Sequence, residues 1–411
     1  MQYNQRPAPT PVPDNTNTYW QHLDQEIAYL KRRSRRQFLM TAGGFIGGTA
    51  VVMGGAALLS HGLPLSLKRA NCTSSTVASL SENALMAAPA PTILKVCQLN
   101  KSINFFPFYV AQQQGFFTAQ GLTIPNPPLL QVGTKVVSAL ESGDYDIGNG
   151  VITDAFTWAR TSSSARLLGA FMNGYVVDIV ASNQFEQQMQ VSATSSLAAK
   201  VNALRGKTIG ITGPNTGTQA LLIYLFRQQG LDASKDITQV SLGSNNKAAL
   251  AALKAGQVDA LSFFSPIGQT AEAEGIGDIF ISPVRGDVPG LRGDVHGVFY
   301  ARQSVINAKS QAIVAYIRAI NQAEAFIQSN AAQAKVLLNS YLGLGQSISD
   351  AVYAATATDI AKSPQISQAA YNIAGQFHVQ AGLVSLIPSY NKLVATSTID
   401  SALGLSAAPC P

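Results

Sequence analysis

The sequence of 411 residues has few of the side chains from which metal or thiol sites are built. It contains three cysteines, Cys72, Cys97 and Cys410, and only four histidines. The cysteines lie outside ligand spacing of one another and are too few for a disulfide framework, although whether any two of them pair stays open. The sequence therefore predicts no metal site and no cofactor.

Charged residues are also scarce, and their sign is unevenly distributed. They make up 12% of the chain, about half of the usual share. Residues 1–69 hold eight Lys and Arg against three Asp and Glu, whereas residues 70–411 hold twenty against nineteen. A body so close to neutrality has no basic face for nucleic acid, and we expect no such partner.

Sequence motifs of common enzymes are missing as well. The chain contains no G-x-S-x-G, no G-x-x-x-x-G-K-[ST] and no G-x-G-x-x-G. Residues 244–247 match S-x-x-K without its companion motifs, so we expect this segment to cap a helix. Within the body only His296 and His378 remain, and neither has a partner at metal spacing. The sequence predicts no catalytic residue.

The front of the chain carries an export pattern. Residues 34–39 match the twin-arginine pattern S-R-R-x-F-L, and an uncharged apolar run of 22 residues, 38–59, follows. As a helix this run would extend about 33 Å, enough to cross a bilayer. We expect export by the twin-arginine route to the outer face of the cytoplasmic membrane or the periplasm. Retention of 38–59 as an anchor, cleavage near Ser79 and lipidation at Cys72 all stay open.

A strand that leads directly into a helix is central to the body. Residues 208–212 are β-branched and predict a buried strand, and the turn residues 213–215 follow. We expect Thr216 or Thr218 to cap the next helix. The free N–H groups and partial positive charge of a helix N-terminus favour an anion there, although an ordinary capped turn has the same sequence pattern.

This arrangement occurs twice. A helix end, a glycine C-cap and an acid before a strand recur as A-L-x-x-G-x-x-D at residues 139–146 and 252–259. The expected strands are 93–99, 122–130, 145–148, 208–212, 237–242 and 258–263. The expected helices are 108–119, 133–142, 218–229 and 246–255. Two matched βαβαβ units predict an α/β protein of two lobes with largely parallel sheets.

Two β-rich passages, 166–183 and 296–301, connect the lobes and are expected to pair as a hinge. Helical periodicity follows at 309–328, 331–342, 347–361 and 367–381. The expected domains are a tail with the signal or anchor (1–69), a linker (70–91), the first part of lobe 1 (92–180), lobe 2 (181–294), and the return strand with the helical part of lobe 1 (295–411).

The body resembles the substrate-binding proteins of ABC importers, in the nitrate/sulfonate/taurine and thiamine-precursor group. The pieces that carry the resemblance are residues 106–117, the two A-L-x-x-G-x-x-D segments, 204–210 and 263–266. The resemblance implies a two-lobed Venus-flytrap fold of the type II periplasmic binding proteins, with a helical C-terminal region. It also implies a monomer that binds a small molecule in the cleft and delivers it to an ABC permease.

The resemblance further implies that four loops and the return passage at His296 face the cleft. The implied ligand-binding residues are Asn100, Asn104, Phe105, Gly150, Thr153, Thr216, Gly217, Thr218, Gln219, Phe264, Ser265 and His296. Phe105 is equally compatible with the core, and Asn104 with a helix cap. Many relatives have Trp and an acid where this chain has Phe264 and Ser265, and the missing acid favours an anionic, nitrate-, sulfonate- or taurine-like ligand.

Two other functions share this fold. A ligand-sensing receptor module would use the same cleft. An enzyme resembling the thiamine-pyrimidine synthases would need their cysteine-rich motif, whereas Cys97 stands alone. We expect solute binding rather than catalysis, with nitrate, a sulfonate, bicarbonate, a pyrimidine and an aromatic acid all open as ligands.

Overall fold

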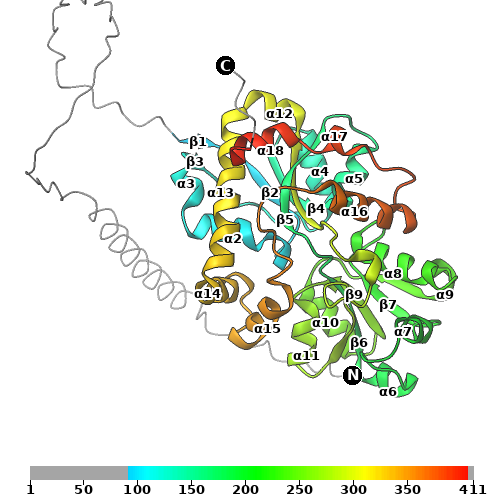
Figure 1. Cartoon of the computed structure of the whole chain (residues 1–411). Coiled ribbons are helices and arrows are strands. Elements are labelled where there is room, and N and C mark those ends of the chain that lie inside the picture. The colour runs from blue at the N-terminus through cyan, green and yellow to red at the C-terminus, as the bar shows by residue number, and fades with distance from the viewer. Residues whose placement is uncertain (1–90, 406–411) are drawn as a thin grey trace, which may run out of the picture. The chain divides into compact units, whose positions relative to one another are not determined.

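The computed structural model describes residues 91–405 (Figure 1). The twin-arginine pattern, the apolar run 38–59, Cys72 and Cys410 lie outside the described residues, so the predictions made for them stay predictions. Within residues 91–405, no helix combines the length and the apolar character needed to cross a membrane.

The first lobe is built on a four-stranded sheet. Its strand order is β2 (Val96–Gln98), β4 (Ile147–Val151), β11 (Gly297–Arg302) and β5 (Ala165–Met172). β2 and β4 are parallel, while β11 is antiparallel to both of its neighbours. A small parallel pair, β1 (Thr92–Ile93) and β3 (Leu122–Thr123), accompanies this sheet.

The second lobe has a five-stranded sheet. Its order is β10 (Gly277–Ile281), β6 (Val177–Ser182), β9 (Ala260–Phe264), β7 (Thr208–Ile211) and β8 (Thr238–Ser241). β7 is parallel to β8 and to β9, whereas β6 is antiparallel to β9 and β10. In each sheet, the reversed strand is the one that enters from the other lobe. The sheets are therefore mixed at β6 and β11 and parallel elsewhere, as the two-lobed α/β prediction requires.

Helices cover both sheets. In the first lobe they are η1 (Ile103–Phe105), α2 (Phe106–Gln113), α3 (Phe116–Ala119), α4 (Gly133–Glu141) and α5 (Ile152–Ala159). In the second lobe they are α6 (Asn183–Met189), α7 (Leu197–Ala203), α8 (Gly217–Gln228), α9 (Ala233–Asp236), α10 (Asn246–Lys254), α11 (Ile267–Ala273) and η2 (Pro289–Leu291). The C-terminal region adds α12 (Gln303–Ala308), α13 (Ser310–Ser329), α14 (Ala331–Leu342), α15 (Gln346–Thr356), α16 (Gln368–Gln380), α17 (Tyr390–Leu393) and α18 (Thr396–Leu403).

The repeated A-L-x-x-G-x-x-D segments perform the same task in both lobes. Gly143 and Gly256 end α4 and α10 with φ of 86° and 66°, a backbone conformation that glycine adopts without steric cost. The carboxylates of Asp146 and Asp259 then accept the backbone N–H of Lys95 and Thr208, each at 2.8 Å. Each acid thus fixes the start of the neighbouring strand, which confirms the predicted repeat.

Two connections run between the lobes, residues 173–176 after β5 and residues 282–296 before β11. β5 and β11 pair as predicted, but they do so inside the first sheet rather than as a separate hinge. β6, the remainder of the predicted passage, belongs wholly to the second sheet. The expected boundary between residues 180 and 181 falls inside β6.

The cores explain why the C-terminal helices stay with the first lobe. α13 packs against α2, α3 and α18 (Figure 1), and Tyr316 on α13 stacks on Phe117 with ring centroids 5.1 Å apart. A separate cluster of buried residues around Leu253, Phe263 and Ile267 lies in the second lobe. Both sets bury aromatic and aliphatic surface, the main stabilising contribution to such cores.

Candidate functional site

The N-terminus of α8 faces the first lobe without the predicted side-chain cap. Thr216 occupies the cap position, but its hydroxyl donates to the carbonyl of Gly213 at 2.7 Å. The hydroxyl oxygen of Thr218 accepts the N–H of Thr212 at 3.1 Å. Thr216 is therefore the N-cap residue, as one of the two predicted alternatives had it, but neither threonine hydroxyl accepts an amide of the helix, because the turn's own polar groups compete for them.

The backbone amides of this helix end remain outside the helical ladder. The first intrahelical bond runs from the N–H of Ala220 to the carbonyl of Thr216 at 2.9 Å. The N–H groups of Gly217, Thr218 and Gln219 therefore precede the first turn and point along the helix axis. They supply hydrogen-bond donors at the contact between the lobes.

Tyr175, in the connection after β5, contacts this helix end. Its hydroxyl donates to the carbonyl of Gly217 at 2.6 Å. A Cβ atom on Gly217 would lie 2.9 Å from Tyr175 Oη, 3.5 Å from Thr153 Oγ1 and 3.7 Å from His296 Cε1. The close approach of α8 to these side chains thus depends on the absence of a Cβ atom at residue 217.

His296 lies beside Tyr175 and is fully buried. Its ring centroid is 4.3 Å from that of Tyr175 and 5.8 Å from that of Phe264. Among the described residues neither ring nitrogen has a hydrogen-bond partner. Burial lowers the pKa of His296 to about 3, so at neutral pH the ring carries one N–H donor and one acceptor nitrogen.

Thr153 on α5 pairs with His378 on α16. The distance from Thr153 Oγ1 to His378 Nε2 is 2.7 Å, and His378 Nδ1 lies 2.7 Å from the carbonyl oxygen of Ala374. That carbonyl only accepts, so Nδ1 carries the proton. Burial lowers the pKa of His378 to about 4, so Nε2 is unprotonated and accepts the Thr153 hydroxyl.

α16 contacts both lobes, as Figure 1 shows by its place between α5 and α8. The ring of Phe377 lies 4.8 Å from that of Tyr175 and 5.1 Å from that of Tyr224 on α8. Arg227 on α8 donates to the carbonyl of Gln380 at 2.6 Å. A helix of the C-terminal region therefore forms one wall where the two lobes meet.

Two further buried polar groups lie close by. Asn104 Oδ1 would be 3.0 Å from a Cβ atom on Gly297, the residue after His296, and it has no partner among the described residues. Asp294 is fully buried, and within residues 91–405 neither of its carboxyl oxygens has a partner. Burial raises the pKa of the Asp294 carboxyl well above its usual range.

We call the residues around this contact the interlobe cluster. Its members are Asn104, Thr153, Tyr175, Gly217, Phe264, Asp294, His296, Phe377 and His378. Five of them were implied from the sequence, namely Asn104, Thr153, Gly217, Phe264 and His296. Their role in ligand binding stays a prediction, but the fold brings them together from five separate segments.

The other implied residues make contacts within the protein, and their role in ligand binding stays a prediction. Phe105 packs edge-on against Phe171 in the core, so its core alternative describes it best. Gly150 faces Tyr300 and Asp154. The hydroxyls of Thr216 and Thr218 bond within the turn before α8. The side chain of Gln219 accepts the N–H of Asn215, and the hydroxyl of Ser265 donates to Gln269. The backbone carbonyl of Asn100 accepts from the side chain of Gln98.

Sequence reasoning missed four members of the cluster, Tyr175, Asp294, Phe377 and His378. No spacing connects them to the other members, because they come from three separate segments: the connection after β5, the connection before β11, and α16. The scarcity of histidine in the body was the one usable signal for His378.

The helix cap predicted at residues 244–247 is confirmed. The cap of α10 is Asn245, whose side chain accepts the N–H of Ala248 at 3.2 Å. Ser244 Oγ instead donates to the carbonyl of Gln131 in the first lobe at 2.7 Å. This bond joins the two lobes at a second place, between the loops that lead into α4 and α10.

The described residues offer no group of three His, Cys, Asp or Glu side chains that could hold a metal ion. Cys97 lies in β2, and burial raises the pKa of its thiol to about 12, which leaves it a poor nucleophile. The lowered pKa of His378 likewise makes it a weak base for Thr153.

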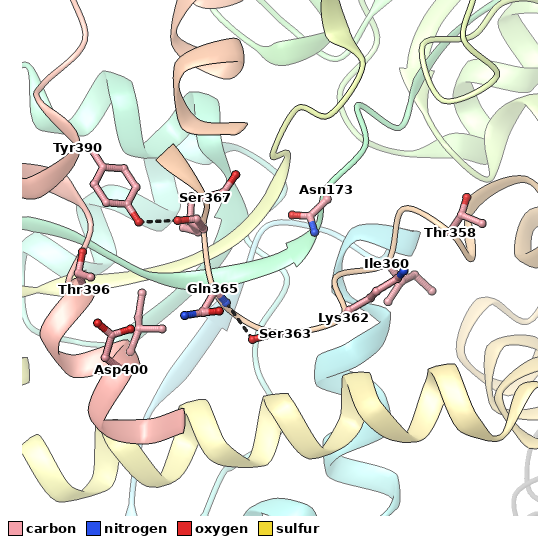
Figure 2. Close-up of a pocket in the computed structure, with 12 residues that line it drawn as sticks. Asn173, Thr358, Ile360, Lys362, Ser363, Gln365, Ser367, Tyr390, Thr396 and Asp400 are labelled. Atoms are coloured by element: carbon pink, nitrogen blue, oxygen red, sulfur yellow. Dashed lines mark hydrogen bonds between the residues drawn. The ribbon is translucent and has the colours of Figure 1, made fainter. Parts of the chain in front are cut away.

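A pocket of about 510 Å³ lies elsewhere, beside the outer edge of β5. Figure 2 shows Asp400, Thr396 and Tyr390 on one side of it and Lys362, Ile360 and Thr358 on the other. Asn173 is its one lining residue from outside the C-terminal region, and the pocket shares no residue with the interlobe cluster. A molecule in this pocket would not bridge the two lobes.

Comparison with known proteins places this geometry in a family. Residues 87–339, more than half of the chain, match the model of the NMT1-like family. The Bacillus subtilis protein YtlA, named as a binding protein, is 26% identical over 247 residues, which cover 59% of this chain and 68% of YtlA. The riboflavin-binding protein RibY of Chloroflexus aurantiacus is 30% identical over 179 residues, 40% of this chain and 46% of RibY.

The fold has close counterparts among solved structures. The periplasmic nitrate-binding protein NrtA of Synechocystis PCC 6803 superposes with a TM-score of 0.60 at 14% identity, covering 79% of this chain and 91% of NrtA. This likeness establishes the two-lobed fold of a periplasmic binding protein. With the extent of the family match, it shows that the chain belongs to the NMT1-like family.

Proposed function

We propose that this protein is an extracytoplasmic solute-binding protein of an ABC importer, which binds a small ligand between its lobes and delivers it to the permease. One observation carries the proposal. His296 is fully buried where the lobes meet, with both ring nitrogens unpartnered among the described residues and its Cε1 3.7 Å from the position of a Cβ atom on Gly217. A buried polar group without a partner is costly, and a ligand that pairs with it would offset that cost.

The cluster suits a ligand that holds the lobes together. Thr153 and Asn104 belong to the first lobe, Gly217 and Phe264 to the second, and Tyr175 and His296 to the two connections between them. A ligand that contacts all three parts binds the closed form more tightly than an open one. Closure would then be driven by that difference in affinity.

The amides at the N-terminus of α8 favour an electronegative group on the ligand. A helix N-terminus stabilises a negative group by about 0.3–1 kcal/mol when exposed and up to ~2 kcal/mol when partly buried. The names of NrtA and RibY, which bind nitrate and riboflavin, support a small-molecule ligand for this chain as well. The proposal also includes that the protein is a monomer, that it catalyses no reaction and that it is exported by the twin-arginine route.

A binding screen tests the function. The full-length protein is melted with nitrate, methanesulfonate, taurine, bicarbonate, pyrimidines and aromatic acids, and hits are titrated by calorimetry. We expect at least one compound to raise the melting temperature. His296→Leu should weaken its binding by tenfold or more, or about 1.4 kcal/mol. Equal affinity of this variant would contradict a ligand site at the interlobe cluster.

A further inference from the structure

The pocket beside the outer edge of β5 has the size and the lining of a small-molecule site. Its volume of about 510 Å³ lies within the usual range for such sites. Buried Ile360, Ile366 and Ile399 line it together with polar side chains (Figure 2). Apolar surface with a few polar groups is the usual composition of a pocket that binds a small molecule.

Backbone hydrogen bonds hold the walls of this pocket in place. Almost all of its lining comes from two segments, residues 358–367 and 390–400. The N–H groups of Ala361 and Ala395 donate to carbonyl groups of β5 at 3.0 and 2.9 Å. The hydroxyl of Tyr390 joins the two segments, because it donates to a carbonyl of the first at 2.5 Å. Walls that are fixed before a ligand arrives lose little entropy when it binds.

The pocket carries one charge of each sign on opposite sides. Figure 2 shows exposed Lys362 on one side and half-buried Asp400 on the other. Among the described residues, neither side chain takes part in an ion pair. Thr396 Oγ1 lies one helical turn before Asp400 on α18 and is buried without a hydrogen-bond partner among those residues. A buried polar atom without a partner is costly, so a ligand that bonds to it would offset that cost.

An ammonium group fits the side of the pocket that Asp400 and Thr396 form. Its N–H groups can donate to the carboxylate and to the hydroxyl oxygen together, and hydrogen bonds between charged groups are stronger than neutral ones. A carboxylate fits the side of Lys362 for the same reason. A ligand with a single charge pairs with one side of the pocket and leaves the other unpaired.

We infer that this pocket is a second ligand site, which takes a zwitterion whose ammonium group pairs with Asp400 and Thr396 and whose carboxylate pairs with Lys362. Because the two charges of the pocket lie on opposite sides, those of the ligand are separated by several carbon atoms, as in an ω-amino acid. Its apolar chain would contact the three isoleucines. Asn173, which also lines the pocket, begins the connection from β5 to the second lobe. The bound zwitterion therefore contacts that connection without entering the interlobe cluster.

The test measures the binding of ω-amino acids to the full-length protein by calorimetry. The probes are 4-aminobutyrate, 5-aminopentanoate and 6-aminohexanoate, each compared with the carboxylic acid and the amine of the same chain length. We expect at least one zwitterion to bind tenfold or more tightly than its acid and about threefold more tightly than its amine, because Asp400 is half-buried and Lys362 exposed. Asp400→Asn should lower the affinity for that zwitterion by tenfold or more, and Lys362→Met by about threefold.

Two further variants serve as controls. Lys392→Met removes an exposed lysine of α17 that does not line the pocket, and His296→Leu alters the interlobe cluster. Both should leave the affinity for the zwitterion unchanged. Loss of that binding in His296→Leu together with unchanged binding in Asp400→Asn would place the zwitterion between the lobes and overturn the inference. Equal binding of each zwitterion and its singly charged analogues, or no binding, would overturn it too, whereas the proposed function depends on His296 and is decided separately.

Discussion

His296 shows how the burial of one side chain changes the dependence of protein stability on pH. An imidazole exposed in the unfolded chain has a pKa near ~6.5, whereas burial lowers that of the folded protein to about 3. Between these two values the unfolded chain binds a proton that the folded chain does not. The free energy of unfolding therefore falls as the pH falls below ~6.5.

Acid unfolding tests this assignment. Between about pH 7 and about pH 5, we expect the wild type to lose about 2 kcal/mol more stability than His296→Gln, measured by urea unfolding. The buried carboxyls of Asp154 and Asp178, whose pKa burial raises to about 6, act in the opposite direction in both proteins. The difference between the two curves therefore isolates His296, and parallel curves would contradict its burial as a neutral ring.

A substitution at Gly217 tests whether ligand binding requires the close approach of α8 to Tyr175. A methyl group there would meet Tyr175 Oη at 2.9 Å, so Gly217→Ala should separate α8 from the connection after β5. We expect ligand affinity to fall by tenfold or more, with little change in melting of the unliganded protein, because alanine favours a helix. Gly213→Ala is the matched control, since a Cβ atom there has nothing nearer than Thr216 Cγ2 at 3.9 Å.

Residues of the cluster were predictable where they lie at the carboxyl end of a recognisable strand or in the helix that follows it. Thr153 and Gly217 belong to the helices after β4 and β7, Phe264 ends β9, and the carboxyl ends of parallel strands share one edge of a sheet. His378 and Phe377 could not be found this way, because α16 reaches the cluster only through tertiary packing. The protonation of Thr153 and His378 depends in turn on the carbonyl of Ala374, which no sequence pattern indicates.

At the scale of elements, most sheet strands and longer helices followed from periodicity and glycine positions. Three expectations differ: β10 was not predicted, the strand expected at 122–130 covers only Leu122–Thr123, and the helix expected at 108–119 is broken into α2 and α3 at Gly115. α13 and α14 lie within one residue of their predicted ranges, because long amphipathic helices repeat their apolar pattern many times. The short helices α5, α6, α7 and α11 were not predicted, since one or two turns give too little periodicity. The N-caps of α8 and α10 fall within the predicted positions, at Thr216 and Asn245, but the side-chain bonds were not predictable, because several Thr, Ser or Asn side chains compete there.

The hydrogen bond between the loops before α4 and α10 should stabilise the closed form without contributing to the folding of either lobe. Ser244→Ala removes the bond to the carbonyl of Gln131, a contribution of about 0.5–1.5 kcal/mol. We expect ligand dissociation to accelerate by several-fold in stopped-flow measurements while the unliganded protein melts as before. Ser340→Ala, which removes an exposed serine bonded to its own helix at Val336, should leave dissociation unchanged. Identical rates for both variants would exclude a role for this contact in closure.

At the scale of the whole molecule, export is the prediction that lies outside the described residues. Replacing Arg35 and Arg36 with Lys removes the paired arginines of the twin-arginine pattern. We expect the variant to accumulate in the cytoplasm, as followed by cell fractionation. Unchanged export would contradict the twin-arginine route, and the mass of the exported protein would separate an anchor from a cleaved signal.

The two connections between the lobes make closure the central claim for the molecule as a whole. Each lobe has its own sheet, and direct side-chain bonds between the lobes are few among the described residues: Tyr175 to Gly217, Arg227 and Gln228 to Gln380, and Ser244 to Gln131. Such contacts fit two lobes that separate and rejoin around the connections.

The distance between spin labels on the two lobes tests that claim most directly. Exposed Lys135 on α4 and Lys247 on α10 are replaced by labelled cysteines, with Cys72 and Cys410 changed to Ser and buried Cys97 retained. With the tightest compound from the binding screen, we predict that a broad distance distribution narrows to one short distance. A distribution that the bound compound leaves unchanged would contradict ligand-driven closure.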